Sequence, residues 1–554
     1  MMHHRFQSEE MLDVLVVGAG PTGLALAAQL CAFGARFRLV DKSLDRAQES
    51  RALAVQARTL ELLESLGLGA KLVSRGNPSA RVLLHFGQER PAEVRLGDFG
   101  AEDTRFPFVL FVPQTETEAV LGEYLDAHDI PIEREVELTA LRQSANGVDC
   151  RLRRRDGREE AVTARYVVGC DGAHSTVRKL VGVPFQGEAY LQDFLLGDVE
   201  VEGALEPDAL HAFAAGPQGV ALFFPLRVPA TWRIITFAEA TAESGRRPVH
   251  AAEALKMNSL PLEELQAAVD GATGGGLRVH SPAWLTHFKL HHRQARHYRV
   301  DRVFLAGDAA HIHSPVGGQG MNTGIQDAWN LGWKLAFVCR RLAEKTLLDS
   351  YEAERWPVGR FLLRTTDRAF GVLVRLMSAG RAARWVRRNV VARVLPRVMQ
   401  SERWRAKAFR FVAELDIHYR GSPAVAEGEP PAHSALRPGE RLPDARVTCD
   451  GREIWLQQEV VGAHLAVLLC GDRGSWDAAQ VEALRDAAGH VVVRHLVHVP
   501  SPGDLVAPTG RLLARFGVVD ETDSAQYVVR PDGYIAYRSA GSDLRLLRER
   551  LLTG

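Results

Sequence analysis

The chain has 554 residues, in which 68 Lys and Arg balance 68 Asp and Glu and leave a formal net charge of zero. At roughly 100 to 200 residues per domain, this length predicts two to four domains, each able to bury a core of its own. A neutral chain has no overall field that attracts phosphate backbones, so a nucleic-acid partner is not expected and small-molecule partners are favoured.

The first predicted elements form a βαβ unit. Residues 12–18, LDVLVVG, are a short apolar run ended by glycine, as in a buried parallel strand. Residues 18–35, rich in alanine and leucine, predict a helix, and FRLVD at 37–41 predicts a second strand. Further along, residues 51–69 predict a helix closed by glycine, and residues 166–180 predict a strand, a turn and a helix. The pattern indicates a Rossmann-like α/β fold.

The middle of the chain has a different pattern. From about Pro184 to His297, segments such as VALFFPL and WRIITFAEA show a more alternating residue pattern and are separated by turns, which predicts an antiparallel sheet. Short strands near Arg81 to Leu96 are expected to join this sheet. RVFLAGDAAH at 302–311 then restores the strand-to-turn pattern, and a long helix is expected from about Asn322 to Cys339. The sequence therefore predicts a β-rich domain inserted within an α/β domain.

Three further segments complete the chain. Residues 375–410 are rich in arginine and predict an amphipathic helix with a solvated basic face; a surface for anionic lipid or nicotinamide nucleotide phosphates is the alternative. Residues 421–439 contain four prolines and indicate a linker. Beyond this segment, strand and helix patterns in the order β-α-β-β-β-α predict a small α/β domain.

The cysteines and the first residues bear on the cellular compartment. The six cysteines are dispersed without a C-x-x-C pair, so neither a disulfide framework nor a thiolate metal site is expected. The start MMHHRFQSEEML lacks a signal-peptide pattern, and the longest apolar stretch, Leu24 to Ala35, is shorter than the roughly 20 residues of a membrane span. These features predict a cytoplasmic protein without a membrane segment.

A glycine motif lies inside the βαβ unit. Gly18, Gly20 and Gly23 form G-x-G-x-x-G between the first strand and the helix, and Asp41 ends the next strand. The first glycine allows a tight turn, the second lets the backbone approach a pyrophosphate, and the third allows close helix packing. Asp41 is then placed to accept hydrogen bonds from ribose hydroxyls. The motif predicts a dinucleotide site, and by itself it does not separate FAD from NAD.

The second half of the chain favours a flavin. Asp308 follows a predicted strand, where it is placed to bond a ribityl chain, and a Pro-Val-Gly-Gly-Gln-Gly loop at 315–320 opens onto a helix. Free backbone amides and the helix dipole at that point stabilise negative charge, as on the N1 and C2 carbonyl of a reduced isoalloxazine ring.

At this point the sequence resembles a known family, the single-component flavoprotein aromatic hydroxylases of the p-hydroxybenzoate hydroxylase-like group. It is most similar to the longer phenol, pentachlorophenol and polyketide hydroxylases with a thioredoxin-like C-terminal domain. The resemblance covers essentially the whole chain and depends on GAGPTG at 18–23, CDGAHSTVR at 170–178 and RVFLAGDAAHIHSPVGGQGMN at 302–322. It implies the fold class: a Rossmann-like FAD-binding domain, an inserted antiparallel β substrate domain and a thioredoxin-like domain.

The resemblance also implies the residues that contact the cofactor. Matching positions are Gly18, Gly20, Gly23, Asp41, Arg51, Gln114, Asp171, Gly172, Gly307, Asp308, Pro315, Gly318, Gln319, Gly320, Met321 and Asn322. Arg51 matches an arginine that follows flavin movement, and Asp171 begins the DG motif that Arg178 ends. For both arginines a surface ion pair is the alternative, and for Asp171 the alternative is a turn residue that bonds its own backbone.

The reaction that the resemblance implies is aromatic hydroxylation. NADPH or NADH reduces FAD, O2 adds at the flavin C4a, and the resulting hydroperoxide hydroxylates an electron-rich phenolic or polyketide ring. The flavin supplies the chemistry, so no catalytic triad is required, and the protein contributes position, a dry pocket and help with phenol deprotonation. The sequence contains one dinucleotide fingerprint, so NAD(P)H has no domain of its own.

The sequence does not locate a catalytic base. The catalytic candidates are Arg51, Tyr190 and His211, and the candidates for substrate contact in the β-rich domain are Phe223, Phe224, Pro225 and Trp284. Core packing is the alternative for aromatic residues on alternating strands. His311 and His313 form H-x-H, but no third ligand has suitable spacing, so no metal is expected. The histidines between 287 and 297 are interpreted as surface polar residues.

The expected domain division follows from these segments. The first part of the FAD-binding domain spans 1–183 and contributes strands near 78–100 to the substrate domain. The β-rich substrate domain spans 184–298, and the second part of the FAD-binding domain with the helical segment spans 299–420. The linker spans 421–439, and the thioredoxin-like domain spans 440–554. Because the last domain lacks C-x-x-C, a structural role or a homodimer contact is expected there instead of dithiol chemistry.

Two other functions stay open. One keeps the flavin but inserts oxygen differently, as in Baeyer–Villiger or epoxidising enzymes, or inactivates an antibiotic. The other is a flavin-binding protein without turnover, against which the intact loop glycines and Asn322 argue. In the favoured interpretation the partners are a small aromatic substrate and O2, with no nucleic acid and no membrane.

Overall fold

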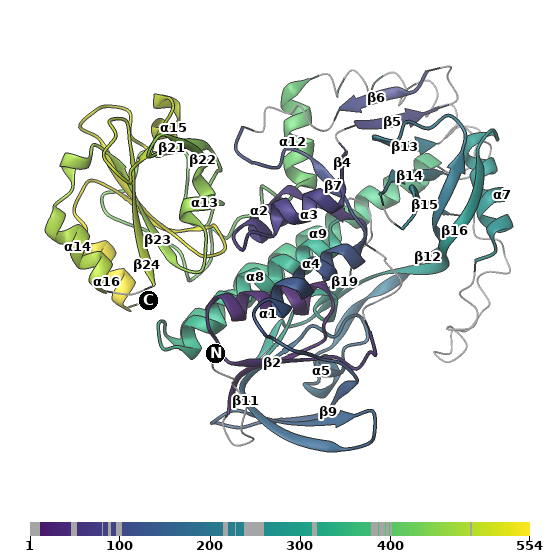
Figure 1. The fold of residues 1–554 in the computed structure, drawn as a ribbon, viewed down its shortest axis with the longest axis horizontal. Coiled ribbons are helices and arrows are strands. Elements are labelled where there is room, and N and C mark those ends of the chain that lie inside the picture. The colour runs from purple at the N-terminus through teal and green to yellow at the C-terminus, as the bar shows by residue number, and fades with distance from the viewer. Residues whose placement is uncertain are drawn as a thin grey trace.

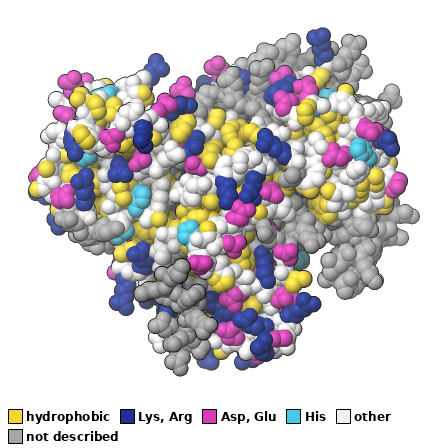
Figure 2. Space-filling view, in the orientation of Figure 1, with side chains coloured by type: hydrophobic (Ala, Val, Ile, Leu, Met, Phe, Trp, Pro, Cys, Tyr) yellow, Lys and Arg dark blue, Asp and Glu magenta, His cyan; other side chains and the backbone are white. Residues whose placement is uncertain are grey.

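A computed structural model of the chain describes residues 11–45, 52–79, 81–86, 90–95, 102–213, 220–227, 229–237, 260–312, 318–377, 401–487 and 490–553, with residues 386, 390, 394 and 398. The described strands form three sheets of eight strands and one of three. Two of the larger sheets lie around a central group of helices, and the third lies in a C-terminal unit at one end (Figure 1). Basic and acidic side chains are interspersed over the face shown in Figure 2, as expected for a neutral chain.

The first sheet contains the expected βαβ unit. Its strands β1 (Leu12–Val17) and β2 (Phe37–Val40) are joined by helix α1 (Pro21–Ala32). Strand β1 pairs in parallel with β2 and with β11 (Glu159–Gly169), and β11 pairs in parallel with β18 (Val303–Leu305). The carboxyl ends of four neighbouring strands therefore meet at one edge. The remaining strands of this sheet are β8 (Ile132–Glu133), β9 (Val136–Gln143), β10 (Val148–Arg154) and β17 (Arg299–Val300).

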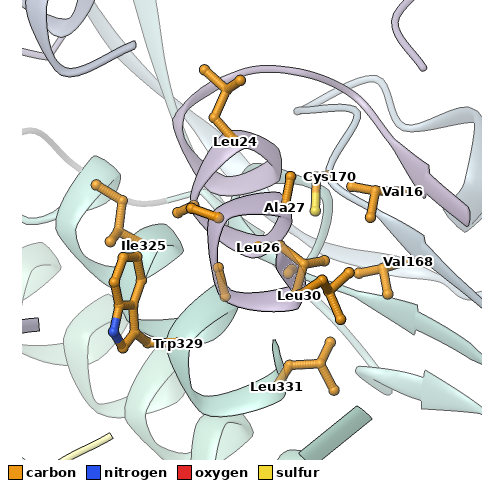
Figure 3. Close-up of a cluster of buried hydrophobic side chains, with 14 of the residues drawn as sticks. Val16, Leu24, Leu26, Ala27, Leu30, Val168, Cys170, Ile325, Trp329 and Leu331 are labelled. Atoms are coloured by element: carbon orange, nitrogen blue, oxygen red, sulfur yellow. The ribbon is translucent and has the colours of Figure 1, made fainter. Parts of the chain in front are cut away.

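Helix α8 (Gly320–Cys339) is almost wholly buried and lies against α1. In Figure 3, α1 is sandwiched between Val16 and Val168 of the sheet and Trp329 of α8. The other helices of this half of the chain are α2 (Ala57–Glu64), α3 (Gly69–Arg75), α4 (Gln114–Asp126), α5 (Thr176–Leu180), α9 (Asp349–Met377) and α12 (Glu402–Val412), with short 3-10 turns η2 (Gly307–Ala309) and η3 (Lys345–Leu348).

One predicted helix starts later than expected, and another lies mostly outside the described residues. The helix expected over residues 51–69 begins only at Ala57, because Ala54–Val55 forms strand β3 and pairs with β7 (Val109–Phe111). This pairing, which β4 (Asn77–Ser79) completes on the other side of β7, overrides the local helical pattern. Most of the helix expected over 375–410 lies outside the described residues.

The second sheet contains the long strands β12 (Phe185–Glu202) and β16 (Arg278–Ala295), which pair with each other. Its pairings are antiparallel except that β13 and β5 run in parallel, and β6 closes its far edge. Helix α7 (Leu262–Thr273), which the sequence pattern did not predict, covers one face of this sheet. The shorter strands are β5 (Arg81–His85), β6 (Ala92–Arg95), β13 (Ala209–Phe213), β14 (Ala221–Pro225), β15 (Trp232–Phe237) and β19 (His311–Ile312).

The third sheet belongs to the C-terminal unit. The predicted order β-α-β-β-β-α corresponds to β23, α14, β24, β26, β27 and α16. Part of the proline-rich segment 421–439 joins this unit, because β20 (Ala426–Glu427) pairs with β27. The bounds are β21 (Arg446–Cys449), β22 (Arg452–Trp455), α13 (Leu456–Val460), β23 (Leu465–Gly471), η5 (Arg473–Ser475), α14 (Ala478–Ala487), β24 (Val491–Val497), β25 (Leu505–Val506), α15 (Gly510–Arg515), β26 (Ser524–Val529), β27 (Ile535–Ala540) and α16 (Arg545–Thr553).

The helices were also compared with the dimensions of a lipid bilayer. In the described part of the chain, none combines the length and the apolar character that a membrane span requires.

Gly332 on α8 gives a test of the α1–α8 contact. A Cβ atom at Gly332 would lie 2.7 Å from Cβ of Gln29 on α1, so Gly332→Ala must push the helices apart. We expect a loss of about 1 to 3 kcal/mol in the free energy of unfolding. In the control, Gly122→Ala on α4, the added Cβ meets nothing within 4 Å. The better helix propensity of alanine should then stabilise by up to about 1 kcal/mol. Denaturant unfolding of both variants measures the difference, and equal stabilities would contradict this packing.

Candidate functional site

The motif residues gather at the carboxyl edge of the parallel sheet. Gly18 follows β1, Asp41 follows β2, Asp171 follows β11 and Gly307 follows β18, and these four strands are neighbours in the order β18-β11-β1-β2. In open α/β sheets, ligands bind in the crevice outside the carboxyl ends of the strands. Motifs that are far apart in the sequence therefore meet at one candidate site.

Two glycines of the first motif are required by close packing within the protein. Gly18 has φ of +103°, and a Cβ there would lie 2.8 Å from Cα of Asp171 and clash with the carbonyl of Cys170. A Cβ at Gly23 would clash with the carbonyl oxygen of Gly18. These two positions close the turn and pack it against the strand ends, because no side chain fits there.

Gly20 has a different environment. A Cβ at Gly20 would meet nothing within 4 Å, so the protein leaves space in front of it. Gly20 is the N-cap of α1, which has no side-chain cap and no acidic residue in its first turn. A helix N-terminus with free amides and open space in front of a glycine fits a pyrophosphate group.

The first and last motifs touch each other through Thr22. A Cβ added at Gly307 would lie 3.1 Å from Cβ of Thr22, and a Cβ at Gly324 of α8 would lie 3.2 Å from Cα of Gly307. Gly307 has φ of +61°, which also favours glycine. The N-terminal ends of α1 and α8 are therefore brought together at the turn that contains Gly307.

Asp41 lies beside the glycine loop. Its Oδ2 accepts a hydrogen bond of 2.6 Å from the amide of Ala19, and its Oδ1 accepts one of 2.7 Å from the amide of Ser43. Arg134 lies 3.7 Å from the same Oδ2. Asp41 thus holds the loop in place. Each carboxylate oxygen has a second lone pair, so further acceptor capacity remains for a hydroxyl group.

Asp171 has a local role in the structure. Its carboxylate accepts hydrogen bonds from the Ser175 hydroxyl and from the amides of Thr176 and Val177, at the first turn of α5. This is the alternative role as a turn residue, and it does not require a cofactor. The adjacent Gly172 has φ of +76°, and a Cβ there would meet nothing within 4 Å.

Arg178 links two motifs. Its guanidinium donates to the carbonyls of Ala173 and Ala309, at 2.8 and 2.9 Å, and lies over the ring of Phe185 at 3.8 Å. Arg178 is buried, which excludes a surface ion pair as its role. It ties the turn after Asp171 to the turn that contains Asp308, whose own side chain is exposed.

The start of α8 faces the segment that follows Arg51. The side chain of Asn322 is fully buried; its Oδ1 accepts from the amide of Gln56, and its Nδ2 donates to the carbonyls of Ala54 and Gly318. Gln319 is the N-cap of α8 and donates to the carbonyl of Phe411. These side chains support the helix start, and the amides at its first turn are the groups left to meet a ligand.

Several remaining site residues can be placed only in part. Gln114 begins α4, accepts from the amide of Ala52 at 3.4 Å and donates to Glu118 at 2.8 Å. Gly320 and Met321 form the first residues of α8. Arg51, Pro315 and His313 lie outside the described residues, and so does the side chain of Tyr190.

The second sheet presents two different faces, because side chains alternate along each strand. Phe224, Arg233, Asp198 and Trp284 are directly opposite one another across β14, β15, β12 and β16, so they share a face. Arg233 donates to the carbonyl of Ala52, and Phe224 contacts Phe111 with ring centroids 5.5 Å apart. This face, which we call the inner face, lies against residues 52–54 and Phe111, and Ala54 in turn contacts the loop at Gly318, where an added Cβ would lie 2.8 Å from Ala54 Cβ.

Other candidates lie on the opposite face. His211 and Phe223 are cross-strand partners, and Phe223 packs with Leu265 of α7 in one buried cluster. Pro225 shares this outer face, because it is two residues from Phe223 along β14. The structure therefore brings Phe224 and Trp284 toward the candidate site, and it places His211, Phe223 and Pro225 away from it.

His211 is not placed to act as a base at the site. Its Nδ1 lies 3.0 Å from Nε2 of His85, and its Nε2 lies 3.0 Å from the carbonyl of Glu206. Burial, followed by the neighbouring His211, lowers the pKa of His85 to about 4, and burial also lowers the pKa of His211. Both rings are thus neutral at pH 7, and they pack against each other on the second sheet.

Three buried charged residues were missing from the sequence analysis. Asp198 and Arg233 form a bidentate ion pair at 2.6 and 2.7 Å, and both are buried. Asp327 of α8 accepts from the amide of Gly307 and from His311 Nε2. The available signal was a charged residue inside an otherwise apolar strand or helix, as in WRIITF, but the partner of each charge could not be identified from spacing.

Glu414 lies beneath the first turns of α8. It is fully buried and accepts hydrogen bonds from the Thr323 hydroxyl, at 3.2 Å, and from the side chain of Gln326. Burial raises the pKa of Glu414 to about 8, in spite of the nearby Arg355. The acid is therefore largely protonated at pH 7, so the helix start does not face a full negative charge from below.

Comparisons with known proteins agree with this geometry. Residues 11–366 match the family model described as FAD binding domain. The chain is 33% identical to 6-methylpretetramide 4-monooxygenase of Streptomyces rimosus, over 97% of this chain and 93% of that protein. It is 34% identical to rifampicin monooxygenase of Streptomyces venezuelae, over 98% of both. The solved structure of CabE, an aromatic hydroxylase from angucycline biosynthesis, superposes with a TM-score of 0.73 and 29% identity, over 98% and 99% of the two chains.

Substitutions in the first glycine loop separate folding from cofactor binding. Because the space in front of Gly20 is open, Gly20→Val should leave the thermal midpoint of the cofactor-free protein unchanged but abolish FAD retention. Gly23→Val must displace the Gly18 carbonyl and should also destabilise the fold, by about 2 kcal/mol or more. Flavin absorbance and thermal unfolding measure both effects. A yellow Gly20→Val protein would show that this loop does not hold the pyrophosphate.

The pH dependence of stability tests the buried Glu414. Between its ordinary pKa of 4.5 and the folded value of about 8, only the folded carboxyl holds a proton, so raising the pH favours unfolding. Relative to Glu414→Gln, which cannot titrate, the parent protein should lose about 1.4 kcal/mol per pH unit across this window. Denaturant unfolding of both proteins from pH 5 to 8 gives the difference, and parallel curves would rule out a protonated Glu414.

Proposed function

The chain belongs to the FAD binding domain family, and from that premise we propose that it is a monooxygenase that uses NAD(P)H and O2 to hydroxylate a phenolic or polyketide-type aromatic ring. The observation that carries the proposal is the meeting of three separated motifs at one sheet edge, where Thr22 packs against Gly307 and α8 begins. The relatives named above support the reaction class.

FAD is the cofactor, and the residues present fit it. Bound FAD accepts hydride from NAD(P)H and activates O2. The open space at Gly20 and the N-terminus of α1 would hold the pyrophosphate, and Asp41 would accept from the adenosine ribose. Asp308 would face the ribityl chain, and the amides at Gly320 and Met321 would stabilise negative charge on the flavin ring.

The inner face of the second sheet is the proposed substrate side. Phe224 and Trp284 would pack against an aromatic ring, and the buried Arg233 lies 6.0 Å from the Trp284 ring with its charge compensated by Asp198. Apolar side chains on this face would exclude water from the reacting ring. The relative from Streptomyces rimosus is named a 6-methylpretetramide 4-monooxygenase, and CabE is described as an aromatic hydroxylase from angucycline biosynthesis, which supports an aromatic substrate on this face.

We also propose the domain division predicted from the sequence. The three large sheets would correspond to an FAD-binding domain, an inserted substrate domain and a thioredoxin-like domain at 440–554, to whose sheet the preceding segment adds the edge strand β20. The central strands β23 and β24 of the last domain are parallel, and β26 and β27 pair antiparallel beside them, as a thioredoxin-like order requires. Cys470 is buried in β23 and no C-x-x-C exists, so this domain would not carry out dithiol exchange.

A second substrate class has specific support. The 34% identity to rifampicin monooxygenase extends over 98% of both chains, so oxidation of an antibiotic is the alternative to a biosynthetic hydroxylation. The deciding experiment is to purify the protein with FAD, measure NADPH and NADH oxidation with phenols, polycyclic aromatics and rifampicin, and identify products by mass. A gain of one oxygen atom supports the proposal. NAD(P)H oxidation that yields only hydrogen peroxide with every aromatic would overturn it.

Two neighbouring phenylalanines on β14 provide a matched test of the substrate face. Phe223 is fully buried on the outer face, so Phe223→Ala should cost about 3 to 5 kcal/mol of stability. Phe224 is half-buried on the inner face, so Phe224→Ala should cost less stability. It should instead raise KM or the fraction of uncoupled NAD(P)H oxidation several-fold. Steady-state kinetics and thermal unfolding of both variants decide, and a reversed pattern would contradict the assignment of the faces.

A further inference from the structure

A stripe of polar residues runs along the buried helix α8. Thr323, Asp327, Asn330 and Lys334 are spaced by four, three and four residues, so they lie on one side of the helix, and each is at most 1% exposed. Charged groups rarely lie inside a protein unless they are paired, because removal from water is costly. We call these four residues the α8 polar stripe, and their partners come from distant parts of the chain.

The end of the stripe nearer the C-terminus is satisfied by α9 and by the C-terminal unit together. Glu354 of α9 accepts from Lys334 Nζ at 2.7 Å, from Asn330 at 2.6 Å, and from both terminal nitrogens of Arg530 at 2.6 and 2.9 Å. Burial alone would raise the pKa of Glu354, but Arg530 and Lys334 hold it well below its usual range. Arg530 is thus the main counter-charge of a buried carboxylate on another domain.

Arg530 belongs to a hairpin turn that inserts into the first half of the chain. The turn, residues 530–534, joins β26 to β27 and is the RPDGY of the sequence. The backbone carbonyl of Asp532 accepts a hydrogen bond from the guanidinium of Arg58 on α2. The Asp532 carboxylate lies 3.4 Å from the side-chain nitrogen of Asn330 in the stripe. Tyr534 packs against Tyr419 with ring centroids 4.2 Å apart and the ring planes tilted by 38°, and both residues are buried. We call these five residues the docking turn.

The other end of the stripe reaches the turn that contains Gly307. Tyr419, whose ring contacts Tyr534 of the docking turn, accepts a hydrogen bond of 3.0 Å from Arg355 of α9. Arg355 donates through Nε to Asp327 Oδ1 at 2.7 Å and through a terminal nitrogen to the carbonyl of Thr323. Asp327 Oδ2 then accepts from the amide of Gly307 at 3.0 Å. One buried ring contact followed by buried hydrogen bonds therefore joins the docking turn to the turn that contains Gly307.

We propose that the docking turn of the C-terminal unit is a positioning element for the cofactor site, acting through Tyr419, Arg355 and Asp327 on the Gly307 turn and on the start of α8. This inference rests on the proposed function, because it takes the Gly307–Asp308 turn as part of the FAD site. It assigns the C-terminal unit a role in FAD affinity that does not require thiol chemistry.

The contacts explain why the effect would pass between the units. Loss of Arg530 leaves Glu354 as a buried carboxylate with Lys334 as its one ion-pair partner in the described part of the chain, so α9 must move or admit water. Arg355 follows Glu354 directly on α9, and its guanidinium donates hydrogen bonds both to the Tyr419 hydroxyl and to Asp327. A shift of α9 by a fraction of an ångström changes the support of the Gly307 amide.

The test compares full-length variants by FAD titration. Arg530→Met removes the charge while keeping an unbranched side chain, and Tyr419→Phe removes only the hydroxyl that Arg355 contacts. The control is Arg446→Met, in the same unit, whose ion pair with Glu453 is exposed. We expect the FAD dissociation constant to rise about 10-fold or more for Arg530→Met and about threefold for Tyr419→Phe, with no change for the control. Arg530→Lys should recover part of the loss.

A purely structural role is separated by a second readout. Linkage requires that FAD binding stabilise the docked turn in return, so FAD should slow hydrogen exchange in peptides covering 527–537 as well as those covering 303–312. In Tyr419→Phe this protection of 527–537 should fall while the thermal midpoint stays near that of the parent. Unchanged FAD affinity in Arg530→Met and Tyr419→Phe, or no FAD-dependent protection of 527–537, would overturn the inference. A parent protein that binds no FAD would instead refute the proposed function.

Discussion

The close approach of two helix starts to one glycine turn is the constraint on which the rest of this structure depends. Thr22 of α1 packs against Gly307 and Gly324, so α1, α8 and the turn after β18 can meet only if those two positions have no side chain. The approach places two sets of free helix amides at the same sheet edge. It also brings α8 into the buried interior, where its charged side chains Asp327 and Lys334 are paired with buried partners.

The two faces of the second sheet are packed in different ways. The outer face is completed by α7 and forms an ordinary apolar core around Phe223 and Leu265. The inner face cannot close in the same way, because the Asp198–Arg233 pair reaches from it to the backbone of Ala52. One face of the sheet is therefore covered by α7, and the other face is the one that the proposed function assigns to substrate contact.

The sequence predicted local features well and distant pairings poorly. The βαβ unit, the glycine turns and α8 were predictable because their signals lie within a few residues and have direct backbone causes, such as the positive φ of Gly18. The start of α2 at Ala57 was not, since pairing of Ala54 with Phe111 decides it. Which of Phe223 and Phe224 faces inward depends on the register of the sheet. The hydrogen-bond partners of Asp327 lie on other elements, the Gly307 turn and α9, which are distant from one another in the sequence. Asp171 illustrates a further limit: a motif residue can serve its own helix, as its bonds to α5 show.

The proline-rich segment before the C-terminal unit has a consequence for recombination between relatives. Because β20 lies on the edge of the third sheet beside β27, and Arg538 binds the carbonyl of Ser434, the connection is part of the folded unit and not a free tether. A chimera that exchanges C-terminal units would therefore have to cross over before Ala426. It would also have to inherit matching charges on both sides, since Glu354 and Lys334 come from one parent and Arg530 from the other. Whether C-terminal units can be exchanged between relatives therefore depends on compatible buried charges. The length of the connecting segment does not predict it.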